Sequence, residues 1–296
     1  MIVPDAVERD LVGRRIVVGV GVGAELLPSV LAARERTDGG TWRLRCPADV
    51  VAELGRAFVL GTAVAEACDS GRIELRVAPS PAAPRRLFAT DETVLALVGP
   101  EGDRTVLTES DPGVVTAVES AATERFEASE PATVAMPGRT RLIETARSRI
   151  GPRFAEDLAS VVSTADPGAF GRATPASDRV LLLALGARHD HLFATVREWA
   201  DDVGIAGRQT FTEPRRLLVD EGLVESVKVP MGVGHPNYRL RAADETLVHG
   251  TAAEVVGVLR DRLAEGIPSE LDRKAGNTRE TTDPHAIDTP VWERRE

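Results

Sequence analysis

The chain is poor in long apolar runs and in cysteine, and each shortage excludes a class of protein. No run of about eighteen apolar residues occurs, so we expect no transmembrane helix. The first ten residues are acidic rather than cationic, which argues against a secretory signal. Cys46 and Cys68 lie outside any CxxC spacing, and we expect them to be buried, reduced thiols in a cytoplasmic protein.

Lysine is nearly absent as well. Only Lys228 and Lys274 are lysines among 36 basic residues, against 46 acidic residues and a net charge of −10. This balance favours a salt-adapted, halophilic cytoplasm, although GC-rich codons alone would also favour arginine. At molar salt the Debye length falls to about 3 Å, so the overall charge would scarcely repel a polyanionic partner at a distance.

Signatures of catalysis and of metal binding are also missing. The sequence shows no Ser/His/Asp or Cys/His grouping around a glycine elbow and no paired carboxylates, so we expect no enzyme. His189 and His191 form an HDH triplet without a thiolate or a third ligand in register. We interpret the triplet as a solvated turn between helices and expect neither a metal nor a cofactor.

The stretch from residue 177 to 243 has the strongest pattern in the chain. Ser177 is a plausible N-cap for an apolar helix, and a second helix with apolar residues at helical spacing follows from Leu192. A tight turn at 204–207 leads into a third helix, and two alternating strands joined by PMGVGHP complete the stretch. Three helices followed by a β-hairpin is the element order of a winged helix-turn-helix domain. Binding of double-stranded DNA is therefore the leading hypothesis.

The third helix and the hairpin supply the candidate DNA-binding residues. The first turn of such a helix usually meets base edges, where Arg can bridge guanine and Gln can pair with adenine. Cations one turn later and on the wing suit phosphates or the minor groove. The alternatives are a winged helix used only for protein contact and a hairpin with solvated charges. The candidates are Arg208, Gln209, Thr210, Thr212, Arg215, Arg216, Lys228, His235 and Arg239.

Pro214 conflicts with a helix that begins at Arg208. Proline inside a helix removes a backbone hydrogen bond and costs about 3 kcal/mol if nothing compensates. The helix therefore either kinks there or begins late, near Thr212. We expect the inner face of this helix to consist of Phe211, Leu217, Leu218 and Leu223.

Charge is distributed unevenly along the chain. Residues 177–243 carry nine basic and nine acidic side chains, so the rest of the chain carries the whole net charge of −10. Residues 208–241 contain six basic and four acidic side chains. This local excess suits contact with phosphates, although a solvated amphipathic face could also produce it.

The region before the winged helix predicts an α/β domain with a mixed sheet. Its order is βαβαβ followed by hairpins, with a helix over 48–71 broken near Gly61 and a helical stretch over 140–163 interrupted at Pro152. After the wing, Val255, Val256, Leu259 and Leu263 form a stripe that packs either on its own domain or on a second copy. The predicted parts are a sensing or dimerisation domain (1–163), a linker (164–176), the winged helix-turn-helix (177–243), a C-terminal helix (244–266) and a disordered tail (267–296).

A dinucleotide-binding fingerprint is present in relaxed form at the end of the first strand. Gly19, Gly21 and Ala24 fit GxGxx(G/A) between a strand and a helix, but the acidic residue expected after the second strand is missing. Glycines of a tight strand-to-helix turn explain the pattern equally well. These residues are therefore weak candidates for cofactor binding.

The sequence WADDVGIAG, together with LVDEGLVESVKVPMGVGHP, resembles the haloarchaeal TbsP-type transcriptional regulators. The resemblance is most specific at 202–206, 221–223 and 228–230, and a weaker similarity extends into the N-terminal half. It implies an archaeal two-domain regulator of sugar metabolism genes, with a sensing or dimerising part and a winged-helix DNA reader. Glu213, Pro214 and His235 depart from the family's usual residues.

These observations predict a sequence-specific, DNA-binding transcriptional regulator of sugar or central carbon metabolism genes. We expect a homodimer whose N-terminal domain binds a small metabolite, or alternatively dimerises without a ligand. The competing hypothesis is a nucleotide-binding or protein-interaction module whose winged helix is only structural.

Overall fold

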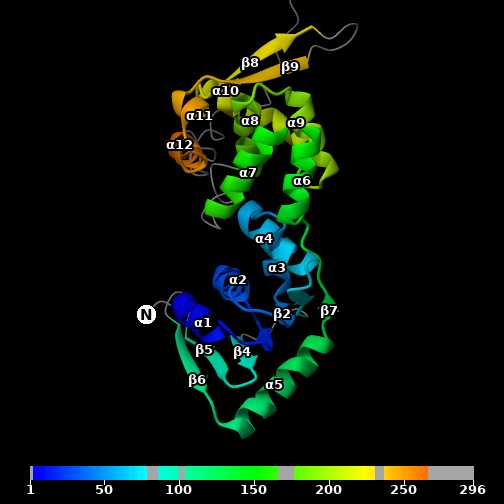
Figure 1. The fold of residues 1–296 in the computed structure, drawn as a ribbon, viewed down its shortest axis with the longest axis vertical. Helices are drawn as coiled ribbons and strands as arrows, with labels where there is room; N and C mark the ends of the chain where they lie inside the picture. Colours follow the sequence, from blue (N-terminus) through cyan, green and yellow to red (C-terminus); the bar gives the residue numbers. More distant parts are fainter. Residues whose placement is uncertain (1–2, 79–85, 100–103, 166–176, 231–236, 266–296) are drawn as a thin grey trace, which may run out of the picture.

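The computed structural model describes residues 3–78, 86–99, 104–165, 177–230 and 237–265. The molecule is elongated, with an α/β half at one end and a helical half that ends in a β-hairpin at the other (Figure 1). Within the described residues, no helix is both long enough and apolar enough to span a bilayer.

The α/β half is built on one seven-stranded mixed sheet, which confirms the predicted sheet type. Three neighbouring strands are parallel and the others pair antiparallel, in the order β6-β5-β4-β1-β2-β3-β7. The strands are β1 (Val17–Val20), β2 (Trp42–Cys46), β3 (Ile73–Val77), β4 (Arg86–Thr90), β5 (Val94–Val98), β6 (Thr105–Glu109) and β7 (Glu130–Pro131).

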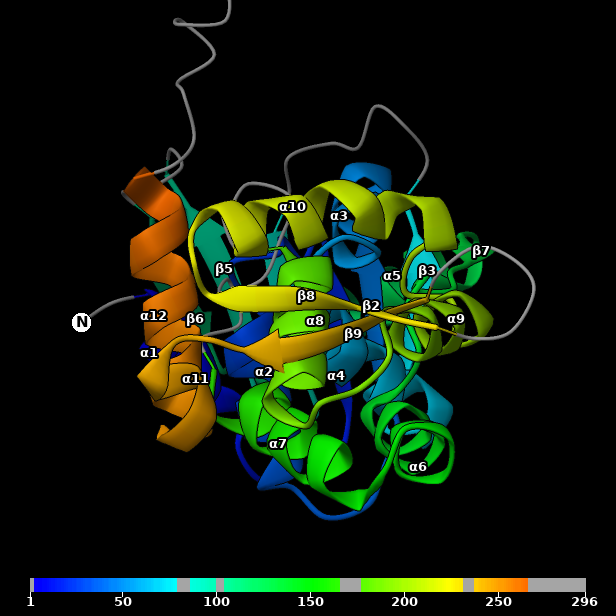
Figure 2. The same cartoon turned by 90° about the horizontal axis from the view of Figure 1, so that it is seen from above.

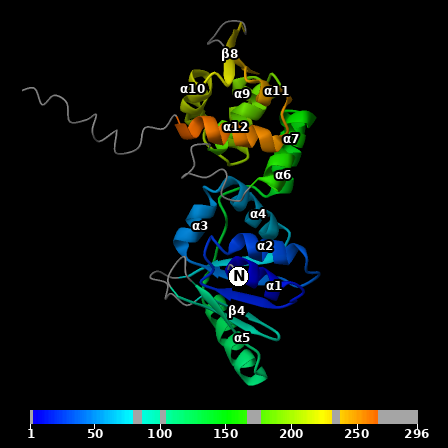
Figure 3. The ribbon, with the colours of Figure 1, turned by 90° about the vertical axis from the view of Figure 1, so that its left-hand side faces the viewer.

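Helices cover the two faces of this sheet unequally. On one face α5 (Pro112–Glu127) packs Phe126 against Val18 and Val20, and Asp111 caps it by accepting hydrogen bonds from the Gly113 and Val114 amides at 2.9 and 3.0 Å. The other helices of this half lie on the opposite side of the sheet (Figure 3). They are α1 (Val3–Leu11), α2 (Leu27–Glu35), α3 (Ala48–Leu54) and α4 (Phe58–Asp69).

The predicted break at Gly61 is wrong. The chain breaks earlier, between the end of α3 at Leu54 and the start of α4 at Phe58, and Gly61 lies buried inside α4. A Cβ atom at Gly61 would stand 2.1 Å from the carbonyl oxygen of Leu54. Glycine is therefore present so that the two helices can approach closely, not because the helix ends there.

Two helices that the sequence grouped with the α/β part also contact the helical half. The break at Pro152 is confirmed, because α6 (Arg139–Arg149) ends before it and α7 (Pro152–Thr164) begins at it. The Trp199 indole donates to the Thr145 hydroxyl of α6 at 3.2 Å, and its ring meets Phe154 of α7 edge-on at 5.6 Å. These contacts link α6 and α7 to the later helices, while α6 also contacts α4 of the α/β half.

The helical half has the predicted helix order closed by a hairpin. Ser177 caps the first of these helices by accepting from the Val180 amide at 3.4 Å, and residues 181–185 of that helix are completely buried. The elements are α8 (Asp178–Arg188), α9 (Phe193–Asp202), the 3-10 turn η1 (Arg208–Phe211), α10 (Thr212–Asp220), β8 (Val224–Val229), β9 (Asn237–Ala242), α11 (Glu245–His249) and α12 (Ala252–Glu265).

The apolar stripe of α12 packs on its own domain. Val255, Leu259 and Leu263 are fully buried in the shared core, and α12 contacts α7, α8 and α11. This decides between the two alternatives for the stripe. The predicted linker beyond Ala165 and the predicted tail lie outside the described residues.

Candidate nucleic-acid interface

The recognition segment (η1 and α10) and the wing (the β8–β9 hairpin) lie together at the end of the molecule farthest from α5 (Figures 1 and 2). Phe211, Leu218 and Leu223 are fully buried and fix the segment against the other helices, while Leu217 is partly buried. The predicted inner face is thus confirmed. The opposite side of the segment faces solvent.

Pro214 causes no loss of helix hydrogen bonding. The 3-10 turn ends at Phe211 and α10 begins at Thr212, so Pro214 stands in the first turn of α10. Amides of a first helical turn have no partner within the helix, so a residue without an N–H costs little there. The late start, one of the two interpretations of this proline, is the observed one.

The residues expected to read bases differ in availability. Gln209 and Thr210 are exposed, and Thr212 is partly exposed. Arg208 is also exposed, but its guanidinium pairs with Asp201 at 2.8 Å and with Asp202 at 3.4 Å. Hydrogen bonding to Asp201 raises the pKa of Arg208. Arg208 can therefore contact a base only if its ion pairs with Asp201 and Asp202 break.

Arg216 is held in the same way. Its guanidinium pairs with Glu213 one helical turn earlier at 2.9 Å, and both side chains are largely exposed. The positive charge of Arg216 is thus balanced locally. The Glu213 carboxylate is likewise already paired with an arginine.

Arg215 is partly exposed and lies over two aromatic rings. Its guanidinium carbon lies 4.3 Å from the ring centre of Tyr238 and 5.0 Å from that of Phe193, and it donates to the Ser226 hydroxyl at 3.3 Å. The side chain thereby joins α10 to the wing and to the start of α9. Arg215 has no ion pair with the part of the chain that the structure describes.

Arg197 is a candidate that the sequence analysis did not single out. It stands one turn after Phe193 on α9, and its guanidinium carbon lies 5.3 Å from the centre of that ring. Its Nε atom is buried and has no hydrogen-bond partner among the described residues. Its spacing of four residues from an aromatic residue was the available signal. We call Phe193, Arg197, Arg215 and Tyr238 the arginine–aromatic cluster.

The wing carries two further cations without acidic partners. Lys228 and Arg239 are exposed, on β8 and β9 respectively, and neither makes an ion pair within the described ranges. Arg241, farther from the tip, pairs with Asp190 at 3.3 Å. His235, the remaining wing candidate, lies outside the described residues.

The histidine triplet is part of the scaffold. Asp157 of α7 accepts from Arg188 at 2.9 Å and lies 2.8 Å from His189 Nε2, while His191 packs edge-on against Phe154. Burial lowers the pKa of His191. An open cavity of about 510 Å³ lies beside both histidines, but no three potential metal ligands gather anywhere in the described residues.

The weak dinucleotide candidates form a packed turn. Gly19 lies inside the sheet, where an added Cβ would stand 2.8 Å from Val22 and 3.0 Å from Leu44. The Gly21 amide, just after β1, donates to the Arg45 carbonyl at 2.9 Å, and so does the Val22 amide at 3.2 Å. These amides are unavailable to a pyrophosphate, which supports the turn interpretation. Ala24, the last position of the fingerprint, is partly buried against the core in the turn before α2.

The cysteines form no disulfide. Cys46 is buried and Cys68 half-buried, and both are free. Burial raises the pKa of Cys46 to about 12 and that of Cys68 to about 11. Both thiols therefore stay protonated and unreactive at neutral pH.

An α/β domain followed by helices, a recognition segment and a wing defines the class of winged-helix regulators. Two family descriptions match the chain: Transcriptional regulator TbsP-like, N-terminal, over residues 6–137, and Transcriptional regulator TbsP-like, C-terminal HTH domain, over residues 138–260. The chain belongs to this TbsP-like family of transcriptional regulators. The division at 137/138 coincides with the start of α6 in the structure.

Comparisons with individual proteins add less. No curated protein matches the chain. Among solved structures, the archaeal chromatin protein TrmBL2, described as showing a novel mode of DNA binding, is similar with a TM-score of 0.34 and 16% identity. The similarity covers 42% of this chain and 48% of TrmBL2, so the match spans less than half of either protein.

Proposed function

We propose that this protein is a sequence-specific regulator that binds duplex DNA through the recognition segment and the wing. The observation that carries the proposal is the group of four cations without acidic partners among the described residues, on α9, α10 and the two strands of the wing: Arg197, Arg215, Lys228 and Arg239. Cations that are not paired within the protein gain the most from neutralising phosphates, because they break no internal ion pair.

In this proposal the unpaired cations contact phosphates, and the exposed neutral side chains of the recognition segment contact bases. The four unpaired cations hold the DNA backbone and set the register, and Gln209, Thr210 and Thr212 read base edges in the major groove. Arg208 and Arg216 contribute once DNA draws them from their carboxylates. His235 is kept as a wing candidate on the sequence argument alone.

The physiological role rests on the family and on the architecture. We propose a cytoplasmic homodimer that regulates genes of sugar or central carbon metabolism, with the α/β half as sensor or dimerisation domain. Dimers read two half-sites about one DNA turn apart. Since the α12 stripe is buried within one chain, the dimer contact lies elsewhere on the surface.

Mobility shift or fluorescence anisotropy at molar salt tests the proposal directly. Promoter fragments upstream of the gene for this protein and of sugar-metabolism genes are compared with scrambled duplexes of equal length. The proposal predicts tighter binding to at least one promoter and a loss of that preference in Gln209→Ala. The matched control is Arg260→Ala, which removes an exposed arginine on α12 that pairs with neighbouring Asp261. Equal affinity for promoter and scrambled duplexes would refute sequence-specific binding.

A further inference from the structure

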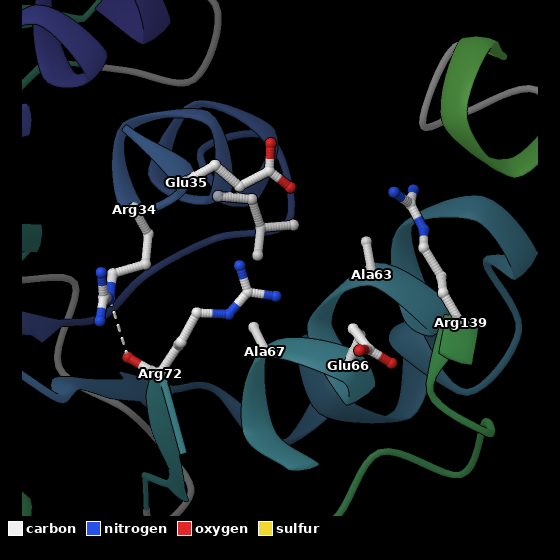
Figure 4. A pocket seen from close by; sticks show the side chains of 8 residues that line it. Arg34, Glu35, Ala63, Glu66, Ala67, Arg72 and Arg139 are labelled. Atoms are coloured by element: carbon white, nitrogen blue, oxygen red, sulfur yellow. Dashed lines mark hydrogen bonds between the residues drawn. The ribbon is translucent and has the colours of Figure 1, made fainter. Parts of the chain in front are cut away.

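A small polar pocket lies where the two halves of the molecule meet (Figure 4). Its walls come from α2, α4, the residue before β3 and the first residue of α6, and its volume is about 50 Å³. Three arginines and two glutamates line it: Arg34, Arg72, Arg139, Glu35 and Glu66. The pocket therefore contains ionic groups from both halves.

Arg34 lines the pocket, but its guanidinium donates to the backbone. It is buried and donates to the carbonyl oxygens of Arg72 and Gly40 at 3.1 and 2.6 Å, and also to that of Thr37. Burial lowers the pKa of Arg34, and the nearby charge of Arg72 lowers it further. Arg34 therefore contributes positive potential rather than a hydrogen bond.

Arg72 and Arg139 rise from opposite sides of the pocket with unused donors (Figure 4). Arg72 spends its Nε on the Ser70 hydroxyl at 3.0 Å, and its terminal nitrogens have no acceptor among the described residues. Arg139 donates to the Val59 carbonyl at 3.3 Å, but its Nε is buried without a partner in the described structure. Burial lowers the pKa of Arg139 more than the two glutamates raise it.

An unpaired buried guanidinium donor is costly and is rare in folded proteins. An anion that enters the pocket would balance the excess positive charge, and a small shift of the Arg139 side chain would let it accept from this donor. A volume of about 50 Å³ holds three or four water positions on the scale of roughly 15 Å³ each. That suits one oxyanion group and excludes a whole sugar ring or nucleotide.

We propose that this pocket binds a single oxyanion group, a phosphate or a carboxylate, between Arg72 and Arg139. Guanidinium groups match the geometry of both anions and bind them with paired hydrogen bonds. The group is either a free inorganic ion or the charged end of a metabolite whose remainder extends out of the pocket. Glu35, exposed at the rim, opposes the anion and limits its affinity.

The pocket is joined to the DNA-binding end by α6. Glu66 accepts hydrogen bonds from the Thr140 amide at 2.9 Å and from its hydroxyl at 2.7 Å, directly beside Arg139. About 15 Å along this helix from Arg139, counted at 1.5 Å per residue, Arg149 pairs with Asp202 at 2.7 Å. Asp202 also pairs with Arg208 of the recognition segment at 3.4 Å.

An anion on Arg139 therefore acts at the first residue of a helix whose other end is linked to the recognition segment through Asp202. If its affinity differs between two positions of α6, its binding changes the affinity for DNA. This second step rests on the proposed function, whereas anion binding itself does not.

Thermal unfolding of the full-length protein tests the binding step without DNA. Melting temperature is followed against inorganic phosphate, methyl phosphate and acetate, each at ionic strength matched with chloride. We expect phosphate or acetate to stabilise the protein and Arg72→Gln and Arg139→Gln each to weaken apparent binding about tenfold, equivalent to about 1.4 kcal/mol. Glu35→Gln should bind several-fold more tightly. Arg36→Gln, which alters an exposed arginine paired with Glu8 outside the pocket, is the control and should titrate as the unmodified protein.

Each outcome decides a separate part of the proposal. Stabilisation by inorganic phosphate identifies a free ion as sufficient, and stabilisation only by the methyl ester indicates a phosphorylated metabolite. Saturable stabilisation that persists unchanged in both arginine variants, or none by any anion, overturns the site. Binding that leaves promoter affinity unchanged overturns the coupling through α6. A protein that binds anions but no DNA retains the site and refutes the proposed function.

Discussion

Two exposed arginines of the recognition segment and four other cations at this end of the molecule, on α9, α10 and the wing, have opposite local environments. Arg208 and Arg216 are exposed, and each is held by carboxylates of the same chain. Arg197 and Arg215 lie over aromatic rings, and Lys228 and Arg239 line the wing, with no acidic partner in the described residues. The comparison teaches that the position of the acids, more than the number of arginines, determines which cations are available to DNA.

The largest effect is expected at Gln209, an exposed and uncharged side chain that we propose contacts a base. Gln209→Ala should weaken operator binding by about 1–3 kcal/mol and leave binding to random duplex unchanged, because a base contact carries sequence information and a phosphate contact does not. Anisotropy titrations with both duplexes measure the difference. Equal loss on the two duplexes would place Gln209 among the phosphate contacts.

Removing Arg215 should affect DNA binding and stability together. Arg215→Ala is expected to weaken all duplexes about tenfold and to lower the free energy of unfolding by about 1–2 kcal/mol, since it loses two cation–π contacts and the bond to Ser226. Urea unfolding measures the second effect. Arg215→Lys keeps the charge and is the matched variant. A lysine variant as unstable as the alanine variant, with near-normal DNA affinity, separates the stacking role from the charge.

Replacing Lys228 or Arg239 should weaken DNA binding without lowering the stability of the fold. Because both side chains are exposed, Lys228→Ala and Arg239→Ala are each expected to weaken all duplexes several-fold without changing the urea midpoint. Arg241→Ala, which alters the wing arginine paired with Asp190, should have a smaller effect. If Arg241→Ala weakens binding more than Lys228→Ala does, pairing within the chain does not control availability.

The smallest expected effect is a gain. Glu213→Gln removes the carboxylate that holds Arg216, so Arg216 becomes available to phosphate and affinity should rise about two- to threefold on every duplex. The rise should be largest at low salt. A fall specific to one operator would instead show that Glu213 accepts from a cytosine amino group.

Much of the architecture follows from local sequence patterns. Helical spacing, the Ser177 and Asp111 caps and the break at Pro152 predict elements that the structure contains. Gly61 misled the prediction because its role depends on a contact with Leu54, and contacts between helices leave no periodic signal. The contacts of Trp199 with Thr145 of α6 and Phe154 of α7 were not predicted for the same reason.

The helices and strands that carry the candidate site were predicted, but the partners of its charged side chains were not. Periodicity and the turn before Arg208 locate the recognition segment, and the pattern of the hairpin locates the wing. The partners of each arginine depend on the directions that side chains take after folding. Arg208 and Arg215 therefore differ from expectation, because Arg208 pairs with Asp201 and Arg215 stacks on Tyr238. Arg197 was not predicted as a candidate because its position beside Arg215 on the Phe193 ring depends on contacts between helices.

The salt dependence of DNA affinity tests the central claim most directly. The slope of log affinity against log salt is measured for the unmodified protein, for the double variant Lys228→Ala/Arg239→Ala and for Arg208→Ala/Arg216→Ala. Removing one phosphate neutralisation reduces the slope by about 0.9, so we predict a reduction of about two for the wing pair. We predict a clearly smaller reduction for the pair already neutralised by Asp201, Asp202 and Glu213. The opposite ranking would contradict the claim that internal ion pairs decide which cations bind DNA.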